Sequence, residues 1–287
     1  MSDITAYNFD SIYHQKGIIT AFKEAGYQTA FFSNQRYNHS FIDFFGKEAD
    51  TFDFIKEDSL DSAYNPSDDE LLALVAKELS KGNQKQFIVL HTYGSHFNYR
   101  ERYPSEDAFF LPDYPVEAEV KYRDNLVNAY DNTIRYTDSF LSRLIHMLEE
   151  QHVDAAMLYT SDHGEDIFDD SRHLFLHASP VPSYYQLHVP FLIWMSDTYR
   201  EAYPEHWQTV TGNKDKDVSS SCSFFPTMLE LGGVQTSYRN DSSSVVSPLY
   251  TMKPRVYLND HNEPRPLDDL GMKQPDFQKC QVLGIKY

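Results

Sequence analysis

Two residues with metal-binding side chains, Asp162 and His163, follow an apolar run, residues 155–159, that is typical of a buried strand. A carboxylate oxygen beside an imidazole nitrogen suits Zn²⁺ or Mn²⁺. Open α/β sheets place their ligands at the carboxyl ends of strands, and Gly164 lets the chain turn tightly beside such a site. The alternative is a strand that ends in a polar loop, with Asp162 capping the next helix. This short motif alone favours neither interpretation.

Histidines next to other expected strands strengthen the first interpretation. His96 comes shortly after the apolar run 87–93, and His188 directly precedes the run 189–194. His173 and His177 lie between the Asp-His pair and His188. Because the carboxyl ends of parallel strands meet at one edge, several histidines and one aspartate there indicate a metal or phosphate site.

Five sequence blocks, which occur in a fixed order, carry a family resemblance. They are residues 89–96, 128–138, 161–165, 176–177 and 188–190. Together they resemble the catalytic domain of the bacterial phosphoethanolamine transferases that modify lipid A, in the sulfatase branch of the alkaline phosphatase superfamily. The resemblance extends from about Phe9 to about Gly233. It implies an alkaline-phosphatase/sulfatase-like α/β fold, with a mainly parallel sheet sandwiched by helices.

The resemblance also implies an activity and a location. The activity is zinc-dependent transfer of phosphoethanolamine from a phospholipid headgroup donor to lipopolysaccharide lipid A or another envelope glycolipid, through a phosphothreonine intermediate. The location is the periplasmic face of the inner membrane, with attachment through membrane segments outside this chain. We expect a monomer.

The resemblance assigns roles to four residues. Asp162 and His163 are the expected metal ligands, for Zn²⁺ or alternatively Mn²⁺. His96 and His177 are the expected catalytic residues, which bind the phosphoryl oxygens or a second metal ion. Glu165 orients His163 or caps the following turn, and the sequence favours neither role.

The beginning of the chain departs from the family pattern. In the family, a strand with an acidic metal ligand and a helix start with the threonine nucleophile precede the segment that resembles Asp10 to Asn34. We therefore expect a fragment that lacks both groups, with weak metal binding and little turnover by itself. Thr5 has no strand or acidic ligand before it, so it is not assigned as the nucleophile.

Two other functions stay open. The first is a sulfatase or phosphatase-type ester hydrolase. The sulfatase nucleophile motif, Cys or Ser followed by Pro and Arg, is absent, since Cys222 leads into Ser-Phe-Phe, but the expected region precedes Met1. The blocks 94–96 and 128–138 favour the transferase. The second alternative is a non-catalytic binding domain with a relic metal site.

Composition narrows the class of partner. The chain has 287 residues, of which 41% are hydrophobic, enough for a sizeable core. Its net charge of −18 argues against nucleic acid, which requires clustered basic residues. No apolar run approaches the ~20 residues that span a bilayer. The two cysteines, Cys222 and Cys280, are expected to be free thiols.

Helical and strand patterns alternate along the chain. We expect helices over 11–25, 71–82, 116–150 and 219–231, and strands over 27–32, 87–93, 155–159 and 189–194. This order predicts one domain over 1–287, with strands near Thr29, Val89, Met157 and Leu192 parallel in a single sheet. Residues 260–287, which contain three prolines, are expected to form an irregular C-terminal tail.

Overall fold

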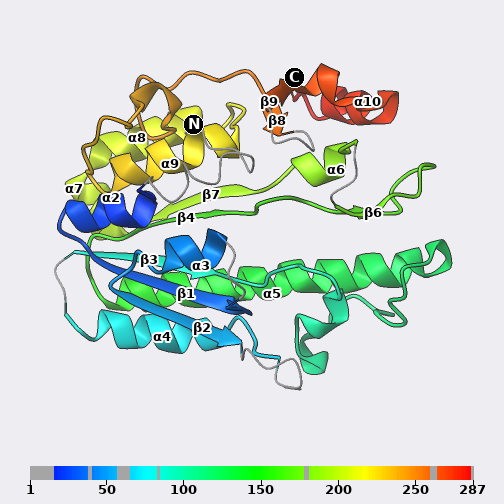
Figure 1. Ribbon diagram of the computed structural model, residues 1–287, viewed down its shortest axis with the longest axis horizontal. Coiled ribbons are helices and arrows are strands. Elements are labelled where there is room, and N and C mark those ends of the chain that lie inside the picture. Colours follow the sequence, from blue (N-terminus) through cyan, green and yellow to red (C-terminus); the bar gives the residue numbers. More distant parts are fainter. Residues whose placement is uncertain are drawn as a thin grey trace. The chain divides into compact units, whose positions relative to one another are not determined.

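The computed structural model describes residues 16–37, 41–56, 65–82, 85–177, 181–258 and 264–285. Thr5 lies outside them. The chain divides into two compact units (Figure 1), one formed by Lys16–Gln151 and the other by His152–Tyr287 with Met1–Gln15. The sequence indicates no boundary at Gln151, and a single functional domain stays a prediction.

The unit Lys16–Gln151 is built on a three-stranded parallel sheet. Its strand order is β2 (Thr51–Lys56), β1 (Gln28–Arg36) and β3 (Gln86–His91). Six consecutive residues of the central strand are buried, as expected for a parallel strand covered on both faces. The predicted strands near Thr29 and Val89 are therefore confirmed as parallel neighbours.

Helices pack around this sheet. They are α2 (Ile18–Glu24), α3 (Phe41–Gly46), α4 (Glu70–Leu79) and the long α5 (Arg123–Glu150). The ring of Phe22 in α2 stacks on Phe87 of β3, with centroids 3.8 Å apart. Helix α5 begins seven residues later than the sequence predicts, because the chain before it forms a 3₁₀ turn, Val120–Tyr122, with a tighter bonding pattern.

One partly buried carboxylate ties the ends of two strands to the start of α4. The Asp68 side chain accepts hydrogen bonds from the Asn34 amide at 2.7 Å, from Tyr93 N at 2.8 Å and from Gly94 N at 2.9 Å. Asn34 is near the end of β1, and Tyr93 and Gly94 follow β3. Asp68 thereby fixes the loop that leads to His96.

We predict that Asp68→Ala lowers the free energy of unfolding by about 2–3 kcal/mol, because two backbone N–H groups and a buried amide lose their acceptor. Urea denaturation measures the change. The neighbouring Asp69→Ala is the control. Asp69 pairs with the partly exposed Arg143, so its replacement should cost less than about 1 kcal/mol. Equal losses for the two variants would contradict the assigned role of Asp68.

The other unit contains a second, separate sheet. Strands β4 (Ala156–Thr160) and β7 (Phe191–Met195) pair antiparallel, with Leu158 opposite Ile193. The prediction that the strands near Met157 and Leu192 are parallel, in one sheet with the other two, is therefore wrong. A parallel return requires a crossover to the opposite end of the strand. The connection 161–190 contains, within its described residues, a small hairpin and one helical turn, and β7 starts beside the end of β4.

The rest of this unit is helical, apart from two small hairpins. Its elements are β5 (Asp166–Ile167), β6 (Phe175–Leu176), α6 (Tyr184–Leu187), α7 (Asp197–Ala202), α8 (Pro204–Asn213), α9 (Ser220–Leu231), β8 (Val256–Leu258), β9 (Pro264–Pro266) and α10 (Gln274–Val282). Met195, Tyr199 and Val246 are at the centre of one hydrophobic cluster. No helix in the described ranges is long and apolar enough to cross a bilayer.

The expected irregular tail contains regular elements. Residues 264–282 form β9, a 3₁₀ turn (Leu267–Leu270) and α10. The prolines that suggested an irregular chain occupy positions that tolerate them. Pro264 and Pro266 are in a strand with one described neighbour, β8, and Pro275 is in the first turn of α10.

Candidate metal centre

Three side chains with metal-binding atoms gather after strand β4. The ligand atoms of His163, Glu165 and His177 all lie within 4.8 Å of one another, and the three residues are partly buried or buried. Two imidazoles and one carboxylate form a donor set that zinc takes in proteins. The cluster lies entirely within the unit that begins at His152.

The first imidazole, His163, has a defined tautomer. Its Nδ1 is 2.9 Å from the carbonyl oxygen of Gly164. A carbonyl oxygen only accepts, so the proton is on Nδ1 and the lone pair is on Nε2. Nε2 is 3.8 Å from the Asp162 carboxylate, whose side chain is 87% exposed. Two atoms that bind one tetrahedral zinc are about 3.3 Å apart, so small movements would let Asp162 and His163 share a cation.

The second imidazole, His177, is oriented by Glu165. His177 Nδ1 donates to the Glu165 carboxylate at 3.1 Å, and this carboxylate is buried. The rings of His177 and His163 are in contact, with centroids 3.7 Å apart and planes tilted by 30°. From the sequence, Glu165 was expected only to cap the following turn or to orient His163. The structure brings it to His177, a partner that the sequence did not indicate.

A short hairpin brings Glu165 and His177 together. Strands β5 and β6 pair antiparallel, with Asp166 opposite Leu176. Glu165 directly precedes β5 and His177 directly follows β6, so both lie at the open end of the hairpin. Among the described residues, four non-glycine residues have positive φ, and three of them, Phe168, His173 and Leu176, are in this stretch. Such conformations cost free energy, and they persist where surrounding contacts impose them.

Gly164 and Asp166 connect this hairpin to helix α6. Gly164 N donates to the carbonyl of Gln186 at 2.8 Å, and a Cβ atom on residue 164 would lie 2.1 Å from the Tyr185 carbonyl oxygen. The Asp-His-Gly motif therefore requires glycine because another backbone passes against it. Buried Asp166 accepts from Ser183 Oγ at 2.7 Å and from the Gln186 amide at 2.6 Å. Burial raises its pKa.

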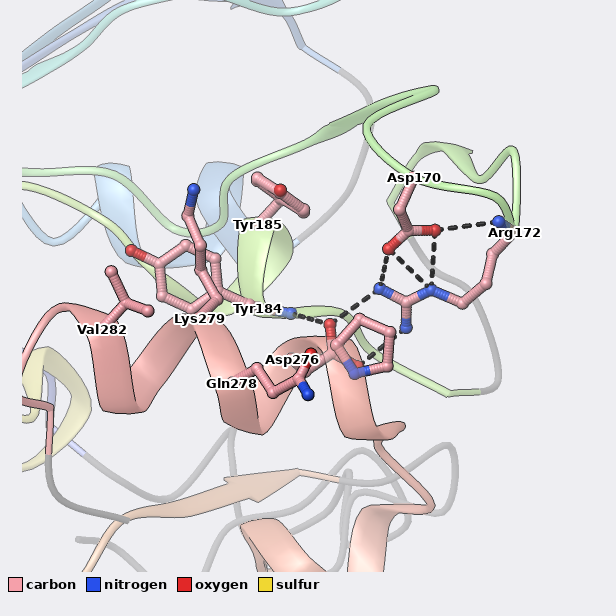
Figure 2. A pocket seen from close by; sticks show the side chains of 9 residues that line it. Asp170, Arg172, Tyr184, Tyr185, Asp276, Gln278, Lys279 and Val282 are labelled. Atoms are coloured by element: carbon pink, nitrogen blue, oxygen red, sulfur yellow. Dashed lines mark hydrogen bonds and ion pairs between the residues drawn. The ribbon is translucent and has the colours of Figure 1, made fainter.

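Helix α10 is attached to the tip of the hairpin through Arg172 (Figure 2). The Arg172 guanidinium donates to the fully buried Asp276 carboxylate at 2.7 and 2.8 Å, and also bonds to Asp170. Asp276 accepts further bonds from the backbone N–H groups of Tyr184 and Lys273. Burial acts to raise the pKa of Asp276, but these hydrogen bonds together lower it below its ordinary value.

His96, the remaining predicted site residue, belongs to the unit Lys16–Gln151. It follows β3, and its ring contacts Tyr93 edge to face, with centroids 5.1 Å apart. The hydroxyl of Thr133 in α5 donates to Ser95 Oγ at 2.7 Å and so holds the same loop. The predicted convergence of His96 with Asp162 and His177 stays a prediction.

The comparisons with known proteins agree with the resemblance. The family model for sulfatases matches residues 1–234. The chain belongs to the sulfatase family. It is 34% identical over 168 residues to the phosphoethanolamine transferase EptA of Salmonella typhimurium, an alignment that covers 56% of this chain and 30% of that relative. The matched segment is thus less than two thirds of the relative's length.

Solved structures show the same fold. The C-terminal periplasmic domain of EptC from Escherichia coli, in complex with Zn, matches with a TM-score of 0.78 at 24% identity. The match covers 90% of this chain and 73% of the EptC chain. The integral membrane protein lipooligosaccharide phosphoethanolamine transferase A of Neisseria meningitidis matches with a TM-score of 0.70 at 25% identity. The match covers 81% of this chain and 44% of the Neisseria chain. The predicted sulfatase-like α/β class is confirmed.

We predict that Asp276→Asn lowers the free energy of unfolding at pH 7 by about 2–3 kcal/mol, because it weakens a buried ion pair and leaves Arg172 partly uncompensated. The folded-state pKa of Asp276 is lowered. Asp276 therefore contributes fully to the free energy of unfolding at pH values above its unfolded-state pKa of about 4. This contribution is lost as the pH falls through its lower folded-state pKa.

Denaturation of wild type and variant at pH 7 and pH 3 tests both parts, and Asp268→Asn, at an exposed position in the same region, is the control. The difference between wild type and Asp276→Asn should shrink at pH 3. A difference that does not depend on pH would show that the charge of Asp276 is not what stabilises α10.

Proposed function

We propose that this chain is the catalytic domain of a metal-dependent phosphoethanolamine transferase that modifies lipid A or another envelope glycan. The observation that carries the proposal is the cluster of His163, Glu165 and His177 beside Asp162. The EptA relative and the zinc-containing EptC domain support it, because both are named as phosphoethanolamine transferases or their domains.

In this proposal the chain's own side chains hold the metal. Asp162 and His163 are the ligands that the resemblance implies, and Glu165 and His177 complete the donor set. Two nitrogens with carboxylate oxygens suit Zn²⁺, and Mn²⁺ is the alternative. When bound, the ion lowers the pKa of the attacking alcohol and polarises a phosphoryl oxygen.

The imidazoles of His96 and His177 have a second task in the proposal. They bind the oxygens of the transferred group and stabilise the negative charge that spreads over them in the transition state. Glu165 fixes the orientation of the His177 ring through a hydrogen bond to Nδ1. A carboxylate that holds an imidazole in one orientation reduces the reorganisation needed during the reaction.

The chemistry follows two transfers of one phosphoryl group. In the proposed reaction a threonine oxygen forms a bond to phosphorus while the bond to the diacylglycerol oxygen of the phospholipid breaks. An oxygen of the glycolipid acceptor then displaces threonine and regenerates its hydroxyl. The donor, the acceptor, a monomeric state and a site of action at the periplasmic face of the inner membrane are all parts of the proposal.

We predict that the cluster binds zinc and that each member contributes differently. His163→Ala should weaken binding by at least about 100-fold, because a direct ligand is lost. Glu165→Gln should weaken it by about 10–100-fold, since the amide still accepts from His177 but lacks the charge. Isothermal titration with Zn²⁺ measures both. His146→Ala, on the exposed surface of α5, is the control and should not change the affinity.

Headgroup transfer from a fluorescent phosphatidylethanolamine tests the reaction in the full-length protein. Asp162→Ala and His163→Ala should abolish transfer, and His146→Ala should retain it. Normal transfer by a His163→Ala protein that has lost zinc would refute the proposed role of the cluster. Hydrolysis of the donor without transfer to any glycolipid would instead favour an ester hydrolase.

A further inference from the structure

A short segment before helix α5 exposes an unusual amount of apolar surface. Phe109, Leu111 and Tyr114 are 64%, 65% and 68% exposed, and Phe110 between them is also exposed. Single exposed hydrophobic residues are common on proteins, but several within six positions mark an interaction site. We call residues 108–116 the apolar loop.

Side chains from α5 hold the backbone of the apolar loop. Buried Asn132 accepts hydrogen bonds from the N–H groups of Phe109 and Phe110, both at 2.9 Å, and donates to the carbonyl of Phe110 at 3.0 Å. Asn128 donates to the carbonyl of Pro112 at 2.9 Å. Pro112 has no N–H group. Protein side chains, rather than water, therefore satisfy much of the polar backbone at the tip.

The apolar loop also presents no outward charge. Its one ionisable acidic or basic residue, Asp113, is buried. The Asp113 carboxylate accepts from Tyr103 OH at 2.8 Å and pairs with Arg100 at 3.0 Å. The surface of the loop thus consists of aromatic and aliphatic groups, and side chains of α5 bond the backbone N–H groups of Phe109 and Phe110 and the carbonyls of Phe110 and Pro112.

We propose that the apolar loop inserts into the surface of a phospholipid bilayer. In water, solvent molecules can satisfy the hydrogen bonds of a loop backbone. In an apolar medium, every unbonded polar group and every charge costs free energy. Aromatic side chains such as those of Phe109 and Tyr114 favour the membrane interface. The guanidinium of Arg135 lies 4.4 Å from the ring of Phe109, in a position to contact lipid phosphates beside an inserted ring.

The net charge of −18 determines which bilayer surface fits. An anionic surface would repel the protein, so attraction must come from apolar insertion into a zwitterionic surface. The structural likeness to an integral membrane protein is consistent with a nearby bilayer. The inference rests on the proposed function only in that the substrates are membrane lipids. Vesicle binding requires neither metal nor nucleophile, so it can fail while the proposed activity stands.

Flotation with vesicles of phosphatidylethanolamine and phosphatidylcholine tests the proposal. Wild-type protein should float with the vesicles in both low and 0.5 M salt, because insertion is not screened as charge attraction is. The vesicle partition coefficient of the triple variant Phe109→Ser, Leu111→Ser, Tyr114→Ser should be lower by about tenfold or more. The control, Leu249→Ser with Val282→Ser, removes two other exposed hydrophobic residues outside the loop and should bind as wild type does.

Two further measurements keep the test decisive. Thermal denaturation of the triple variant should match wild type, because the replaced side chains are exposed; Asn128→Ala, which frees the Pro112 carbonyl, should give an intermediate loss of binding. Equal flotation of wild type and triple variant overturns the proposal, as does binding that salt abolishes. A concentration-dependent dimer in sedimentation velocity that the triple variant abolishes would assign the loop to a second copy of the chain instead.

Discussion

The candidate metal centre depends on one hairpin of two short strands. Its pairing places Glu165 next to His177 although eleven residues separate them in the sequence. Two-residue strands are too short to be stable alone, and three positive φ angles add strain. Buried carboxylates compensate. Asp166 ties the base of the hairpin to the start of α6, and Asp276 ties its tip to α10 through Arg172.

The same device recurs where loops carry the predicted chemistry. Asp68 binds the backbone after β3, and Asn132 binds the backbone of the apolar loop. In each case a polar side chain satisfies backbone groups that regular structure would otherwise pair. The hydrogen bonds of these side chains hold each loop in a defined position. A site assembled from loops gains from this rigidity, because misplaced ligands and donors lose affinity and rate.

Some of this could be predicted from the sequence and some could not. Apolar runs placed the strands near Thr29 and Met157, and the Asp-His-Gly motif located the end of β4. The predicted strand direction was wrong for β7, because an apolar run has the same pattern in either direction and does not show that β7 starts beside the end of β4. Glu165 was not paired with His177, since a two-residue hairpin leaves no periodic pattern. The prolines of residues 260–287 suggested an irregular tail, and α10 was therefore not predicted. Each of them lies in a strand or at a helix start, where proline is tolerated.

The central claim is that His163, Glu165 and His177 surround one metal ion. Anomalous X-ray diffraction at the zinc edge, from crystals of this chain soaked in Zn²⁺, tests it most directly. We expect one peak within about 2.0–2.3 Å of ligand atoms from at least two of these three residues, with Asp162 moved toward it. A peak held by Asp162 and His163 alone, or no peak in this cluster, would contradict the account.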